Sequence, residues 1–206
     1  MKKSSQLPEI VQALLGAKIY PDKPEKIGLV QTQMSFVFLT GAYVYKIKKP
    51  VNLGYLDYTT LEKRHFYCQR EVKLNKRLCP ETYLGVVPIV RKDGKILIGG
   101  QGETIEYAVK MRQLAQEKMM DALLDSNQVS AAMVTRVAQK LAEFHKKAET
   151  NSTISAFGGL NTITQNTTEN FSQTIQYIGT TISQEKHQRI SDYTNRFLKN
   201  NAPLFQ

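Results

Sequence analysis

The spacing of apolar and polar residues changes along the chain and divides it into a β-rich first half and a helical second half. In residues 27–49, IGLVQTQMSFVFLTGAYVYKIKK, β-branched and aromatic runs are interrupted by the tripeptide TGA. This pattern is typical of consecutive antiparallel strands joined by tight turns. Residues 86–100, VVPIVRKDGKILIGG, predict a further hairpin around the turn KDGK, and residues 104–114, TIEYAVKMRQL, predict one more strand.

Helices are predicted before, between and after these strands. Residues 8–15 begin with proline and are followed by Gly16, the residue types favoured at the two ends of a helix. A longer helix is predicted for residues 59–78, because Thr59 and Glu62 fit a capping box and Pro80 prevents continuation. Beyond residue 116, helical periodicity recurs in four segments: 117–124, 130–148, 168–179 and 183–200. Strands, one helix, strands and then helices indicate an α+β fold with a sheet lobe followed by a helical lobe.

Composition narrows the possible partners without changing this fold prediction. The chain has 206 residues, 41% of them hydrophobic, which is enough for one globular domain or most of a two-lobed protein. Its net charge of +10 and pI near 9.5 suit a polyanion, an anionic membrane surface or a phosphorylated ligand. No apolar run approaches the length of a membrane span, and the start lacks the apolar core of a secretory signal. With two cysteines and no CxxC pair, we expect a cytoplasmic protein without a disulfide framework.

The segment VYKIKKP, residues 44–50, carries the candidate chemistry. Side chains alternate along a strand, so Val44, Lys46 and Lys48 share one face. Lys49, beside Pro50, is expected to face solvent. The segment Val44-Tyr45-Lys46-Ile47 resembles the V-A-I-K motif of protein kinases, whose lysine contacts nucleotide phosphates and a glutamate on the following helix.

Glu71 is the expected partner of Lys46. On the predicted helix it shares one stripe with Tyr67, Leu74 and Leu78, which places a carboxylate in line with apolar side chains. The alternative is that Glu71 pairs at the surface with its basic neighbours on the helix, which contributes little to stability.

Several segments in the same order resemble a known family. QTQMSFVFLTGAYVYKIKKPVNLGYLDYTTLEKR, then REVKLNKRLCPETYLGVVPI, YAVKMRQL and LAEFHKKA, are similar to the aminoglycoside-phosphotransferase-like branch of the protein-kinase-like superfamily. More narrowly, the chain resembles an uncharacterised bacterial group in which that domain is often fused to a P-loop ATP-binding domain. The resemblance covers nearly the whole chain and is strongest from Gln31 to Ile89.

The resemblance implies a protein-kinase-like fold and an ATP site. Residues 1–112 would form the nucleotide-binding lobe, with its antiparallel sheet and inserted helix, and residues 113–206 the hinge and an incomplete helical lobe. The turn Thr32 to Ser35 would cover the phosphates, although it lacks the glycines of a protein-kinase loop; a plain hairpin turn is the alternative. Residues 111–114 would be the hinge that meets adenine. The implied nucleotide-site residues are Lys46, Glu71, Ser35, Val44, Met111, Gln113 and Lys48.

The family's catalytic motifs have no match in this sequence. A phosphotransferase of this kind needs an aspartate for the acceptor hydroxyl, and Asn and Asp ligands for Mg²⁺. No H-G-D-x-H-x-x-N motif, D-F-G motif or P-loop is present. We therefore expect this chain to be the N-terminal part of a phosphotransferase that acts on a hydroxyl of an unknown small molecule. We expect no catalytic residue and no metal ligand in the chain itself. Mg²⁺ would bind only together with the missing C-terminal part, and a P-loop domain would be present only in a full-length protein.

Two other functions remain open from the sequence. The chain fits a regulatory or degenerate kinase-like domain that presents a surface to a partner. Alternatively, the basic residues of the 59–78 helix, together with tyrosines 43, 45, 55 and 58, have the composition of a nucleic-acid-binding module. The basic residues occupy several sides of that helix, so nucleotide is favoured over nucleic acid as the partner.

Overall fold

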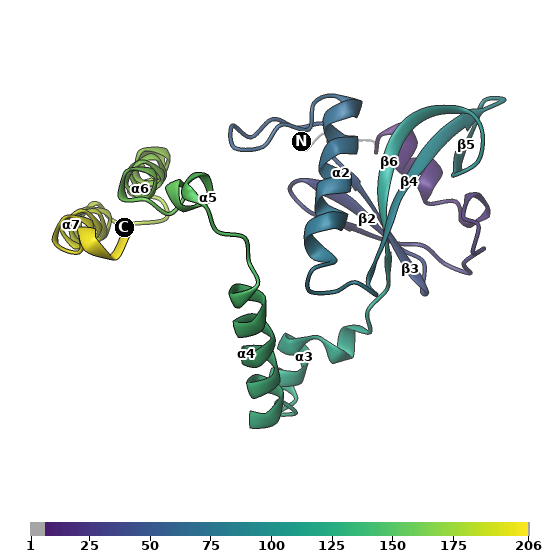
Figure 1. Cartoon of the computed structure of the whole chain (residues 1–206). Helices are drawn as coiled ribbons and strands as arrows, with labels where there is room; N and C mark the ends of the chain where they lie inside the picture. Colours follow the sequence, from purple (N-terminus) through teal and green to yellow (C-terminus); the bar gives the residue numbers. More distant parts are fainter. Residues whose placement is uncertain (1–6, 206) are drawn as a thin grey trace. The chain divides into compact units, whose positions relative to one another are not determined.

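A curled, six-stranded antiparallel sheet dominates the first half of the computed structural model, which describes residues 7–205 (Figure 1). The spatial order of the strands is β1-β2-β3-β6-β4-β5. Their bounds are β1 Gly28–Gln31, β2 Ser35–Leu39, β3 Tyr43–Lys48, β4 Tyr83–Lys92, β5 Lys95–Ile98 and β6 Glu103–Arg112. All adjacent pairs are antiparallel, so the predicted strands and the α+β class are confirmed. Residues 1–6, where the predicted lack of a signal segment partly falls, lie outside the described residues.

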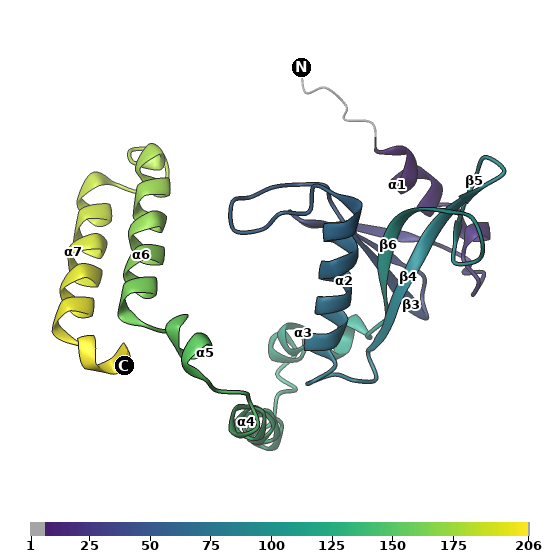
Figure 2. The same ribbon diagram turned by 45° about the horizontal axis from the view of Figure 1, so that its top comes forward.

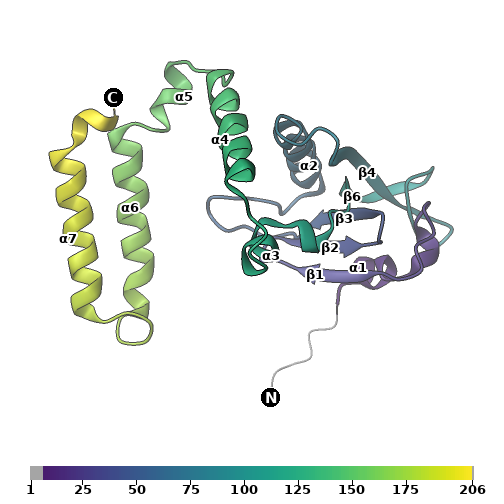
Figure 3. The ribbon, with the colours of Figure 1, turned by 90° about the horizontal axis from the view of Figure 1, so that it is seen from below.

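The two faces of the sheet bury different helices, as Figure 3 shows. On one face, Tyr45 and Ile47 of β3 belong to the main hydrophobic core, to which α1 (Glu9–Leu14) contributes Val11 and Leu14. On the other face, α2 (Leu61–Asn75) packs Cys68 and Val72 against Val109 of β6. The alternation of side chains along β3 therefore directs its even-numbered residues towards α2.

The N-cap of helix α2 lies one residue later than predicted. The N-cap is Thr60, whose Oγ1 accepts the Lys63 N–H at 3.3 Å. Thr59 is engaged elsewhere, because its N–H and hydroxyl both donate to Oδ1 of Asp57, at 2.9 and 2.6 Å. An aspartate that accepts two such bonds holds the chain in a turn before the helix starts.

The far end of α2 also differs from the prediction. The helix ends at Asn75 rather than near Leu78, and a hydrogen-bonded turn, in which Leu78 and Cys79 N–H groups donate to the Asn75 carbonyl, continues from it. Leu74, which belongs to the predicted stripe, is 46% exposed. The buried stripe runs instead through Cys68 and Val72.

The second half is helical, as expected. Its elements are η2 Gln116–Lys118, α3 Met120–Asp125, α4 Ala131–Lys146, α5 Ser152–Ala156, α6 Leu160–Thr174, η3 Ile175–Tyr177, α7 Gln184–Asn200 and η4 Ala202–Phe205, while η1 Ala17–Ile19 follows α1. The short α5 was not predicted, and α6 begins at Leu160 rather than near Thr168. In α4 the periodic apolar side chains Val137 and Leu141 are 47% and 44% exposed.

Contacts divide the chain into two compact units, one ending at Phe144 and the other beginning at His145. In the second unit α6 and α7 form an antiparallel pair (Figure 2). His187 of α7 is buried there against the ring of Phe171 and within 3.4 Å of the Thr174 hydroxyl. The expected functional boundary between residues 112 and 113 stays a prediction. Across residues 7–205, the helices are too short or too polar to span a membrane.

Candidate functional site

Two lysines of β3 share one carboxylate of α2. The Lys46 ammonium donates to Oε1 of Glu71 at 2.9 Å, and the Lys48 ammonium donates to Oε2 of the same side chain at 2.7 Å. The expected contact between Lys46 and Glu71 is therefore present. Lys48, expected to point the same way as Lys46, binds the same glutamate.

Local sequence explains why these three groups meet. Lys46 and Lys48 are two residues apart on a strand, so both project from the face that α2 covers. Glu71 precedes the buried Val72, and it lies one turn from the buried Cys68. The same packing that docks α2 on the sheet thus brings the Glu71 carboxylate to the lysines.

The cluster is largely shielded from water, but unevenly so. The side chains of Lys48 and Glu71 are 4% and 14% exposed, whereas Lys46 is 29% exposed. Burial raises the pKa of the Glu71 carboxyl, but hydrogen bonds and charge from Lys48 and Lys46 outweigh burial and leave that pKa below its ordinary value. Burial lowers the pKa of the Lys48 ammonium, but the hydrogen bond and charge of Glu71 reverse this and raise it.

The electrostatic consequence is a surplus of one positive charge. Two ammonium groups face a single carboxylate, and a partly buried uncompensated charge is costly unless an anion approaches it. Lys46, the more exposed of the two lysines, is the group that such an anion can reach. The arrangement is therefore suited to holding a phosphate or another small anion.

The turn between β1 and β2 is closed by its own hydrogen bonds. Thr32 accepts the Ser35 N–H on Oγ1 at 3.0 Å and donates its own N–H to the Ser35 carbonyl at 2.9 Å. Ser35 is 3% exposed, and its hydrogen bond to Thr32 leaves its N–H already engaged within the turn. Lys49, expected to face solvent, is half-buried: its ammonium donates to the Thr32 carbonyl at 2.6 Å and lies 4.6 Å from the Phe36 ring centroid.

The expected adenine-contacting residues lie at the other end of β3. Val44 and Met111 are paired in register between β3 and β6, so the structure brings these two together. Gln113 follows β6; its N–H donates to the Ala42 carbonyl, and its side-chain oxygen accepts the Gly41 N–H, both at 3.0 Å. Gln113 thus ties the segment after β6, which was expected to be the hinge, to the β2–β3 turn, and its N–H is already engaged there.

Sequence reasoning missed a second buried ion pair beside this cluster. Arg64 of α2 donates from Nε to Oε2 of Glu106 on β6 at 2.7 Å, and its Nη1 donates to the carbonyls of Tyr58 and Thr59 at 3.0 and 3.2 Å. Burial raises the pKa of the Glu106 carboxyl, although the Tyr107 N–H and the Arg64 charge oppose that rise. On α2 and on β6 a charged residue occupies a position that faces the protein interior, and this was the sequence signal that could have revealed the pair.

A cavity of about 340 Å³ lies next to these buried charges. Lys48, Arg64 and Glu106 line it together with apolar side chains that include Ile47 and Phe36. Neither Lys46 nor Glu71 is among its lining residues, so it is not the space in which a ligand would meet Lys46. Within the described residues, no three His, Cys, Asp or Glu side chains converge as metal ligands would.

Comparison with known proteins gives distant relatives only. Uncharacterized protein Rv2004c of Mycobacterium tuberculosis and Uncharacterized protein Mb2027c of Mycobacterium bovis are each 26% identical to the chain over 179 residues, which covers 87% of the chain and 34% of the relative. The chain thus spans about a third of the length of these relatives, whose names state no activity. No family model and no solved structure matches the chain.

Proposed function

We propose that the chain is a nucleotide-binding part of a kinase-like small-molecule phosphotransferase, similar to aminoglycoside-phosphotransferase-like proteins. The single observation that carries the proposal is the shared carboxylate of Glu71, which leaves Lys46 partly exposed beside a surplus positive charge. A site of this kind favours the phosphates of ATP over a neutral ligand.

The order of the elements supports a kinase-like sheet lobe. In protein kinases the phosphate-binding lysine lies on the third strand, and its glutamate partner lies on the helix that follows. Here Lys46 is on β3 and Glu71 is on α2, the next helix in the chain. The pairing of Val44 with Met111 in register between β3 and β6 supports an apolar adenine-binding position at the start of β3.

The proposal for this chain is nucleotide binding rather than turnover. The family's aspartate for the acceptor hydroxyl and its Mg²⁺ ligands have no matching motif in the sequence. Mg²⁺, the acceptor alcohol and any fused P-loop domain therefore belong to the proposed activity of a longer protein.

The test is a calorimetric titration of the purified chain with ATP, in the presence and in the absence of Mg²⁺. Lys46→Ala should weaken binding by about tenfold or more, because it removes the charge that meets the phosphates. Lys95→Ala is the matched control, since it removes the same charge from an exposed position on β5. Equal ATP affinity in wild type and Lys46→Ala, or no ATP binding by the wild type, would overturn the proposal.

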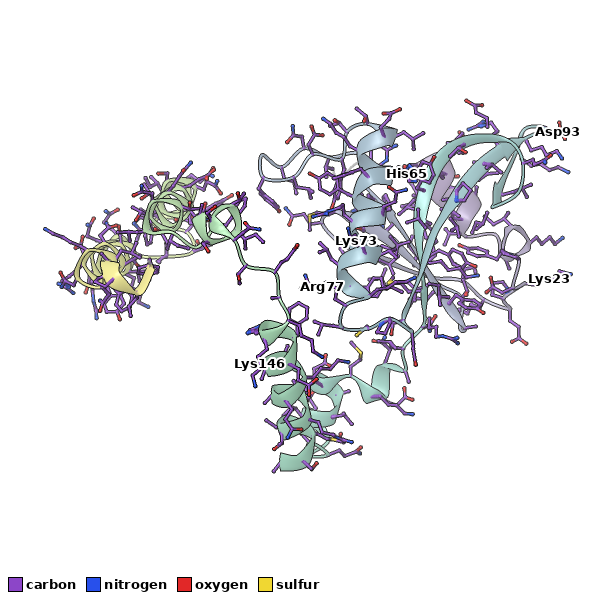
Figure 4. All side chains as sticks on the ribbon, in the orientation of Figure 1. Lys23, His65, Lys73, Arg77, Asp93 and Lys146 are labelled. Carbon is purple, nitrogen blue, oxygen red and sulfur yellow. The ribbon has the colours of Figure 1, made fainter. Side chains whose placement is uncertain are left out.

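Nucleic-acid binding through α2 is the competing function, and the structure gives it less support. The exposed basic residues on and just after α2 include Lys73 and Arg77, labelled in Figure 4. However, the Lys63 ammonium pairs with Asp57, Lys76 donates to the Leu84 carbonyl, and Arg77 lies over the Phe144 ring. The same variants should be titrated with single-stranded RNA. Tight, salt-sensitive binding that Lys46→Ala does not weaken would favour this alternative.

A further inference from the structure

Lys46 and Lys48 occupy opposite sides of one carboxylate but differ in their surroundings. Lys48 lies under the ring of Tyr58, with its ammonium 4.7 Å from the ring centroid, and its side chain is 4% exposed. Lys46 retains 29% exposure while it donates to the other Glu71 oxygen. One lysine is therefore enclosed on its carboxylate, and the other is accessible from solvent.

Resting on the proposed nucleotide site, we propose that Lys48 is a positioning residue that neutralises Glu71, so that Lys46 presents its full positive charge to phosphate. With Lys48 in place, the three groups carry a net charge of +1. Without it, Lys46 and Glu71 form a neutral pair, and an incoming phosphate competes with Glu71 for the one remaining ammonium group.

This role differs from that of a substitute phosphate ligand. To reach a phosphate, the Lys48 ammonium would have to break its contacts with both Glu71 and the Tyr58 ring, because its buried side chain cannot approach solvent while it keeps them. Lys46 can turn a donor towards a ligand while another stays on Glu71, because an ammonium group has three donors. Lys48 thus acts on the ligand through Glu71 and Lys46.

The experiment measures ATP affinity in variants that leave a single uncompensated positive charge at either Lys46 or Lys48. Lys48→Met should weaken ATP binding about tenfold, since the site loses its surplus charge. Lys48→Met combined with Glu71→Gln should return the affinity to within about threefold of wild type, because Lys46 is again an uncompensated cation. Lys46→Met combined with Glu71→Gln has the same net charge but should remain weak, because its cation is the enclosed Lys48.

A conservative variant and unfolding curves distinguish weakened ATP binding from a folding defect. Lys48→Arg keeps the charge and should bind ATP within about threefold of wild type. Urea unfolding of each variant shows whether it is folded under the titration conditions. If Lys48→Met does not fold, Glu71→Gln alone decides: retained ATP affinity supports the inference, and a tenfold loss contradicts it.

The outcomes separate this inference from the function on which it rests. If wild type does not bind ATP, both the proposed function and the inference fail. If wild type binds and Lys46→Met does not, but Glu71→Gln fails to rescue Lys48→Met, the nucleotide site stands and the role of Lys48 is wrong. Rescue of Lys46→Met by Glu71→Gln would instead make Lys48 a direct phosphate ligand.

Discussion

Arg64 of α2 and Glu106 of β6 form a buried ion pair, with Nε and Oε2 separated by 2.7 Å and side chains only 11% and 8% exposed. The pair fastens the beginning of α2 to the strand that runs beside β3. Because Glu71 lies farther along the same helix, the docking of α2 by this pair also fixes where the lysine-binding carboxylate sits.

Loss of Arg64 should destabilise the chain strongly. Arg64→Ala leaves the Glu106 carboxylate buried without its counter-charge, and removes the donor to the Tyr58 carbonyl. We expect the free energy of unfolding to fall by about 3–5 kcal/mol in urea titrations. Arg70→Ala, at an exposed position of the same helix, should change it by no more than about 0.5 kcal/mol. Equal losses in the two variants would show that the pair does not hold α2 in place.

Tyr45 should stabilise the main core through its hydroxyl as well as its ring. The hydroxyl of this fully buried residue donates to Oδ1 of Asp22 at 2.8 Å. Tyr45→Phe should lower the free energy of unfolding by about 2 kcal/mol, since the lost bond has a charged acceptor. Tyr55→Phe is the control because Tyr55 is 76% exposed, and its unfolding curve should match wild type. A Tyr45→Phe curve that also matches wild type would contradict this assignment.

Strand alternation explains which parts of the site could be predicted from the sequence. A period of two on one strand is enough to place Lys46 and Lys48 on a common face, and Glu71 was identified from its place on the following helix. The period of the helix was harder to interpret, because Leu74 is apolar yet 46% exposed. The apolar stripe of a helix is defined by the sheet that covers it, and one sequence does not show where that sheet lies.

The remaining features depend on which strands become neighbours. Lys49 contacts Thr32 because β2 and β3 pair in a register that brings the β1–β2 turn beside it. Arg64 and Glu106 are 42 residues apart and meet only after β6 has inserted between β3 and β4. Register and strand order of this kind are non-local, so local sequence patterns could not supply them.

Glu71 should make the chain sensitive to acid. Its pKa in the folded state is held below the ordinary 4.5, because Lys48 and Lys46 outweigh burial, which alone would raise it. The stabilising contribution of this carboxylate is therefore present above the unfolded pKa and is lost as pH falls through the folded pKa. Urea unfolding between neutral pH and about pH 3 should show this loss in wild type, and a smaller loss in Glu71→Gln.

The control for the acid response is Glu81→Gln, an exposed site next to the α2–β4 turn. It should keep the acid sensitivity of wild type. Glu106 changes the stability of the chain with pH in the opposite direction. Burial raises the pKa of its carboxyl in the folded state, so its contribution to stability diminishes as pH rises through that folded pKa. A Glu71→Gln variant with the full acid sensitivity of wild type would show that the lysine pair does not stabilise the charged carboxylate.

The exposed apolar stripe of α7 should cause self-association. Ile190, Tyr193 and Phe197 are 51%, 61% and 40% exposed, and their spacing places them on one side of the helix. Contiguous exposed apolar side chains favour protein contacts over water. In sedimentation experiments we expect the average mass of the wild-type chain to rise with protein concentration, and Ile190→Lys with Tyr193→Lys to remain monomeric. Gln184→Lys with Gln188→Lys adds the same charge to the opposite side of α7 and should associate as wild type does; a wild-type chain that stays monomeric at every concentration would contradict the prediction.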